Sequence, residues 1–248
     1  MENNILENNV KIETPVETAV RSITRSTLGI ISAIILTVSV LPVSAFEFTY
    51  AFLLLPWVLL DLIMTCVSFG AAKSRNICCI LNLQKVSSGL GLVFTAASLV
   101  FDYLNSYGYI EFDTPWHGIS QGFKLPFNLL NTGFMPTMFL LPLTFFFIAK
   151  FVSLCSVAHC VKTNLPKRGF QIVAAILMLL AFLGFAQDGL DRIHIIPSHY
   201  LYCGIETHNT IIMYTTGAVC LLAAVAALLE VIKYFKNFSK LRKTENAF

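Results

Sequence analysis

Residues 169–187 read GFQIVAAILMLLAFLGFAQ and contain no charged side chain. A helix of this length extends about 28 Å at a rise of ~1.5 Å per residue, close to the ~30 Å hydrocarbon core of a bilayer. Comparable apolar runs occupy residues 28–46, 49–69, 86–104, 137–159 and 211–233. The sequence therefore predicts an all-α fold, a polytopic transmembrane helical bundle of about six spans.

The composition agrees with a membrane protein. Of the 248 residues, 56% are hydrophobic and 12% are charged, whereas a soluble domain carries about 25% charged residues. Too few polar side chains remain to cover a fold in water, so we expect membrane lipids as the main surroundings. The net charge of +3 is small, and no nucleic-acid partner is expected.

The positions of the basic residues predict the orientation. When both termini are placed in the cytosol, fourteen Lys and Arg residues lie at cytosolic ends of the spans, and only Lys124 and Arg192 lie on the other side. Lys150 is set aside because it lies within a span. This asymmetry follows the positive-inside rule and indicates an integral, multi-pass membrane protein with cytosolic N- and C-termini.

The chain divides into three parts. Residues 1–26 form a polar cytosolic tail with a short juxtamembrane helix, because Thr14 to Glu17 fit a capping box with proline at the first helical position. Residues 27–234 form the six-span membrane domain, and residues 235–248 form a basic cytosolic tail. A competing interpretation makes residues 1–45 a cleaved signal, but the acidic residues before the apolar run disfavour it.

Two ionisable residues fall within predicted spans, Asp61 in the second and Lys150 in the fourth. A charge at the centre of a membrane helix costs about 2.5–3.5 kcal/mol on insertion scales, so such residues usually pair or line a pathway. Three interpretations stay open. The pair forms a substrate or proton site, it is a static contact that fixes helix register, or the fourth span covers 129–149 and Lys150 lies at its cytosolic end.

A second polar cluster lies between the last two spans. Its candidate metal ligands are Asp188, Asp191, His194, His199 and His208. Carboxylates one helical turn apart with imidazoles nearby could hold a divalent metal ion that activates water. None of the spacings matches a compact metal motif, so no cofactor is predicted outright, and a solvated polar loop is the competing interpretation.

Cysteines and small residues suggest modification and contact sites. Cys78 and Cys79 are adjacent beside the membrane and are candidates for palmitoylation. Small side chains at Gly217, Cys220 and the alanines that follow form a stripe along the sixth span, which suits close packing of helices. This stripe predicts contacts within the bundle, with self-association or another membrane subunit as the alternative.

The sequence contains no Walker loop, no G-x-S-x-G elbow and no other complete catalytic signature. We therefore expect a small transporter or channel-like bundle, or an accessory or scaffold subunit of a membrane assembly. The alternative is a membrane-embedded metal-dependent hydrolase or transferase that uses the outer Asp/His cluster. An enzyme is the less favoured of these classes.

Overall fold

The computed structural model of the protein describes residues 14–47, 51–73, 77–106, 135–163, 165–193 and 210–245. All regular secondary structure in these segments is helical, which confirms the predicted all-α bundle. The helices are α1 (Pro15–Thr24), α2 (Thr27–Glu47), α3 (Ala51–Gly70), the short 3-10 helix η1 (Ala71–Lys73), α4 (Ile77–Ser106), α5 (Met135–Thr163), α6 (Gly169–Arg192) and α8 (Thr210–Glu245).

Five helical segments of the described chain are long and apolar enough to cross a membrane. They are α1 together with α2, and then α4, α5, α6 and α8; the apolar part Leu55–Gly70 of α3 is shorter. The outer faces of these helices are apolar, as Ile31, Ile34 and Val38 show on α2, where they lie exposed about one turn apart. Such a continuous apolar surface matches lipid and not water.

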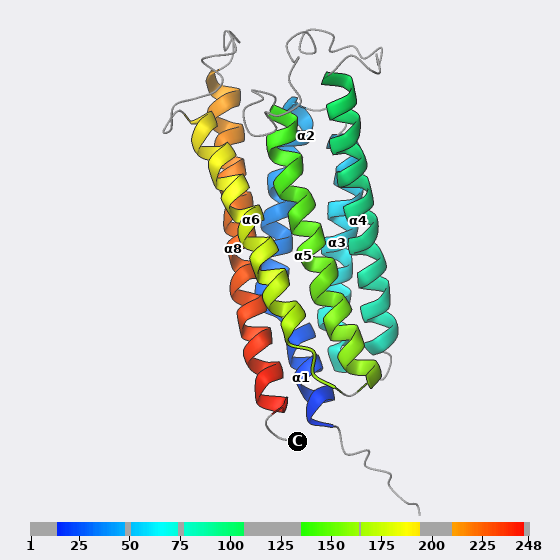
Figure 1. Ribbon diagram of the computed structural model, residues 1–248. Helices are drawn as coiled ribbons and strands as arrows, with labels where there is room; N and C mark the ends of the chain where they lie inside the picture. Colours follow the sequence, from blue (N-terminus) through cyan, green and yellow to red (C-terminus); the bar gives the residue numbers. More distant parts are fainter. Residues whose placement is uncertain are drawn as a thin grey trace, which may run out of the picture.

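The six long helices form a closed ring (Figure 1). Each of α2, α3, α4, α5 and α6 packs against the next helix along the chain, and α8 packs against both α6 and α2. The beginning of α1, the end of α8 and the α5–α6 connection lie at one end of this ring, where Arg168 and Glu245 form an ion pair of 3.1 Å. We call this the α1 end of the bundle.

Aromatic side chains of α5 fill the centre of the ring on the side away from the α1 end. Phe146 and Phe147 are fully buried in one core cluster together with Leu36 of α2. A Cβ atom at Gly91 of α4 would lie 2.5 Å from the Phe147 ring, so only glycine admits that ring here. Packed side chains therefore occupy this part of the bundle among the described residues.

Small residues bring α6 and α8 into close contact. A Cβ atom added at Gly217 would lie 3.1 Å from the backbone oxygen of Gly189, and one added at Gly189 would lie 3.0 Å from that of Gly217. Cys220, Ala223 and the alanines that follow are also buried. The small-residue stripe therefore lies inside the bundle along the α6–α8 contact, as expected for helices that approach closely in a membrane.

Helix α1 begins where the capping box predicts. The Thr14 side chain accepts a hydrogen bond of 3.2 Å from the Glu17 amide, and Pro15 occupies the first turn. Val16 and Val20 are buried against residues of α4, α5 and α8. This short helix therefore packs across the α1 end of the ring instead of continuing straight into α2.

The last turns of α8 belong to the segment 235–248, which the sequence analysis assigned to a basic cytosolic tail. The helix continues to Glu245, and within it Asn237 and Leu241 are buried. It continues because Leu241 packs against the apolar face of α1 and Lys240 donates a hydrogen bond of 3.0 Å to the backbone oxygen of Ser22. Much of the basic segment is thus part of the packed bundle.

Candidate functional site

Four ionisable side chains meet inside the ring. Asp61 comes from α3, Lys150 from α5, and Glu230 and Lys233 come from α8. Asp61 is 1% exposed, Lys150 2% and Glu230 0%. No two of these three helices are neighbours along the ring, so the charges converge on its interior, where an ionised group is costly unless it is paired.

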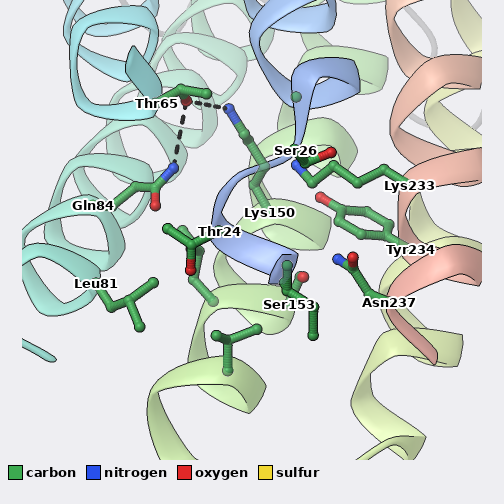
Figure 2. A pocket seen from close by; sticks show the side chains of 14 residues that line it. Thr24, Ser26, Thr65, Leu81, Gln84, Lys150, Ser153, Lys233, Tyr234 and Asn237 are labelled. Atoms are coloured by element: carbon green, nitrogen blue, oxygen red, sulfur yellow. Dashed lines mark hydrogen bonds between the residues drawn. The ribbon is translucent and has the colours of Figure 1, made fainter. Parts of the chain in front are cut away.

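Lys150 pairs with Asp61. The Lys150 ammonium donates a hydrogen bond to the Asp61 carboxylate and lies 3.5 Å from the hydroxyl of Thr65 (Figure 2). Gln84 of α4 extends the network, because its amide nitrogen lies 3.4 Å from the same hydroxyl and its amide oxygen accepts a hydrogen bond of 3.0 Å from Ser68. The ion pair is therefore held by polar side chains from α3 and α4.

Helix α5 determines the depth of Lys150. The helix runs from Met135 to Thr163, so Lys150 lies near its middle and not at its end. A span of 129–149 would have placed this lysine at the membrane surface. The structure instead surrounds it with buried side chains, including the Phe146 ring, whose centroid lies 5.8 Å from the ammonium.

A second ion pair lies on α8. The Lys233 ammonium donates a hydrogen bond of 2.6 Å to Glu230, three residues earlier. The side chain of Lys233 is 15% exposed, although the sequence analysis counted this lysine among the cytosolic basic residues. With both acids ionised and both lysines protonated, the four groups carry no net charge.

A cavity borders this network on the α1 end. It is partly open to the outside. The residues that line it are Ile23, Thr24, Ser26, Gly29, Thr65, Leu81, Gln84, Lys150, Ser153, Leu154, Val157, Lys233, Tyr234 and Asn237. Lys233, Tyr234 and Asn237 point into it from α8, and Leu81 lies on the opposite side (Figure 2).

A break in the helical backbone forms part of the cavity wall. Helix α1 ends at Thr24 and α2 begins at Thr27, with Ser26 between them. Gly29 allows the Lys233 side chain to approach α2, because a Cβ atom at Gly29 would lie 3.1 Å from the Lys233 ammonium. The N-terminal end of α2, which carries partial positive charge, therefore faces the cavity.

Several buried polar atoms around the cavity have no hydrogen-bond partner within the described segments. They are the amide nitrogen of Asn237 and one oxygen each of Asp61 and Glu230. The Tyr234 hydroxyl lies beside the Glu230 carboxylate, which can accept its hydrogen bond. Most buried polar groups in proteins have partners, so such groups usually mark a place for water, an ion or a ligand.

The predicted metal ligands divide between described and undescribed parts of the chain. Asp188 and Asp191 are buried near the end of α6, where Asp188 accepts hydrogen bonds of 2.9 Å from Arg192 and 3.3 Å from Cys220. His194, His199 and His208 lie outside the described residues. Within the described segments no three His, Cys, Asp or Glu residues lie close enough to hold a metal ion, so the outer metal site stays a prediction.

The candidate palmitoylation sites lie at the beginning of α4. Cys79 is exposed and Cys78 is half-buried. Cys78 also lies 3.8 Å from the amide of Asn82 on the next turn. An acyl chain would reach the surrounding lipid more directly from Cys79, and the modification stays a prediction.

Glu230 is the residue of the network that the sequence analysis did not single out. It is the only acidic residue in the apolar run 211–233, and a charge there is as costly as at Asp61. That signal was present, but the basic residues after it made the end of the run resemble a membrane boundary. Only the packing of α8 against α2 and α6 places Glu230 inside the bundle.

Comparison with known proteins does not identify a function. No protein-family model and no curated protein matches the chain, and no solved structure matches it.

Proposed function

We propose that the protein is a small membrane transporter whose solute and proton site is the cavity with the four buried charges. The observation that carries this proposal is that the buried Lys150 of the Asp61–Lys150 ion pair lines a cavity. A contact that only fixes helix register needs no adjoining cavity. A transport site needs both a pathway and a group that changes charge.

The α5 residues before and after Lys150 support an inward-facing state, in which the site is open toward the α1 end. The cavity-lining residues of α5 that follow it, Ser153, Leu154 and Val157, lie toward the α1 end. Phe146 and Phe147 precede it and are fully buried in the core. The site is thus open toward one end of the bundle and closed toward the other, as alternating access requires.

Protonation of Asp61 would couple proton binding to the change between an inward-facing and an outward-facing state. A neutral Asp61 no longer attracts the Lys150 ammonium, so Lys150 becomes available to a solute or to another side chain. Because two charges are balanced by two others in a small volume, loss of one contact also alters the field at Lys233. Proton binding could therefore favour one arrangement of α3 against α5 over the other.

The test is solute flux in reconstituted vesicles. Purified protein would be incorporated into vesicles with an imposed pH gradient, and uptake of a small anion, a small cation and a zwitterion would be compared with protein-free vesicles. We expect pH-dependent flux of one class, which Asp61→Asn abolishes. Lys236→Gln is the matched control, because Lys236 is exposed on α8 one turn from the cavity.

The proposal fails if Asp61→Asn leaves the flux unchanged across pH. It also fails if the wild type moves none of the three solutes faster than empty vesicles do. Size-exclusion chromatography and a thermal melt of each variant confirm that it is folded before its flux is compared.

A further inference from the structure

The lining of the cavity is rich in hydrogen-bond donors and contains no carboxylate. Its charged residues are Lys150 and Lys233, and none of the fourteen lining residues, all in described segments, is acidic. Asp61 and Glu230 form ion pairs with the two ammonium groups but do not line the cavity. A solute in the cavity would therefore meet positive charge first.

One further donor has no acceptor. The amide nitrogen of Asn237 is buried, lies on the cavity wall and has no hydrogen-bond partner among the described residues. Asn237 is 1% exposed and points inward from α8 near Lys233 (Figure 2). Donors that are buried without a partner are costly, and an anionic oxygen would satisfy them.

The N-terminal end of α2 adds to the same positive wall. Ser26 and Gly29 line the cavity at the break before this long helix, and the helix dipole there favours negative charge. Together with Lys150, Lys233 and Asn237, it forms a built anion site instead of an isolated helix terminus.

Part of the remaining wall is apolar, alongside the uncharged polar side chains of Thr65, Gln84 and Ser153. Leu81 of α4, Leu154 and Val157 of α5, and Ile23 of α1 line the side that faces α4. A small inorganic anion would leave this surface unused. A carboxylate with a short apolar chain would use both walls.

We infer that the cavity binds a small monocarboxylate, and that one proton enters the network with each anion. This inference rests on the proposed transport function and names its substrate class. The carboxylate accepts hydrogen bonds from Lys233, Asn237 and Lys150 while its short chain packs against Leu81 and Leu154. The proton converts the Asp61 carboxylate to the neutral acid, which releases Lys150 to the anion.

Charge balance sets the expected stoichiometry of one proton for each bound anion. The four buried groups sum to zero, so an added anion would leave one uncompensated negative charge in a medium of low dielectric constant. The groups that face Asp61 are Lys150 from α5 and, from α8, Glu230, Lys233 and Tyr234. Helix α4 contributes the uncharged Gln84 through Thr65, and α2 has no titratable residue from Thr27 to Leu41.

Binding is tested first, apart from transport. Calorimetric titration of the full-length protein in detergent would use pyruvate, with chloride and methylammonium as the other probes. We expect pyruvate to bind with uptake of one proton, seen with a pH dye in weak buffer. Lys233→Gln and the isosteric Asn237→Asp should each weaken binding about tenfold or more, as the loss of a charge-assisted contact does. Lys236→Gln should leave it unchanged.

The possible outcomes separate the inference from the proposed function. Pyruvate binding without flux in vesicles would support the anion site and overturn the transport proposal. Asp61-dependent flux of methylammonium without pyruvate binding would overturn the anion inference and leave transport standing. Chloride binding as tight as pyruvate binding, or binding that Asn237→Asp does not affect, would overturn the assignment to a carboxylate. Absence of both binding and flux would overturn both.

Discussion

In a double-mutant cycle of the buried ion pair, we predict that each single variant loses more unfolding free energy than the double variant does. The changes are Asp61→Leu, Lys150→Met and their combination. In the single variant Asp61→Leu, the Lys150 ammonium keeps only the contact of 3.5 Å with Thr65. Removing one partner of a buried pair costs about 3–5 kcal/mol of unfolding free energy, whereas replacing both by apolar residues is often neutral or stabilising by up to ~4 kcal/mol.

We therefore expect each single variant to lose about 3–5 kcal/mol and the double variant to be at least as stable as the better single variant. Unfolding in mixed micelles can be followed by fluorescence, because the Trp57 ring stacks on Phe94 of α4 at a centroid distance of 4.2 Å. Replacing the second tryptophan, Trp116, by phenylalanine makes Trp57 the only reporter.

The ion pair of Arg168 with Glu245 provides the matched control. Its side chains are 39% and 44% exposed and 3.1 Å apart, so the same cycle should give a coupling of only about 0–1 kcal/mol. If the double variant at Asp61 and Lys150 instead lost the sum of the two single losses, the two residues would act independently and the reasoning from the buried pair would be refuted. The stable double variant should also lack pH-dependent flux.

Three further predictions concern packing within the bundle. Gly217→Leu should cost about 1–3 kcal/mol through overpacking of α6 against α8, whereas Gly70→Leu, which has open space around it, should cost less; thermal melts of both variants decide this. Val20→Asp should detach the buried face of α1 and speed tryptic cleavage after its arginines, while Thr18→Asp on the exposed face should leave cleavage unchanged. Asp188→Ala should cost about 3–5 kcal/mol, because its buried arginine partner loses a carboxylate; an unfolding midpoint equal to that of the wild type would contradict this.

Local features of the sequence predicted much of the fold. The uncharged run 169–187 predicted α6 from length alone, and the structure extends that helix to Arg192. The capping box at Thr14 predicted the beginning of α1, because the cap depends on residues three positions apart. The spacing of small residues predicted a close helix contact at Gly217, although not which helix it would meet.

The candidate site was only partly predictable from the sequence. Asp61 and Lys150 stood out because a charge within an apolar run is unfavourable wherever the chain folds. Their contact required the ring to bring α3 and α5 together across its interior, and the apolar runs do not encode that closure individually. Asn237 joined the site because α8 continues past the predicted membrane boundary, whereas Glu230 and Lys233 joined it through the rotation of α8 in the ring.

The sequence by itself determined that this chain forms apolar helices long enough to span a bilayer, because backbone polar groups in lipid must be satisfied within each helix. The tertiary structure decided which residues share the interior. Side-chain partners across the bundle depend on helix order, rotation and depth, and these are determined by packing between segments far apart in the chain. That packing places two lysines and a buried amide on the wall of one cavity and pairs each lysine with a buried acid.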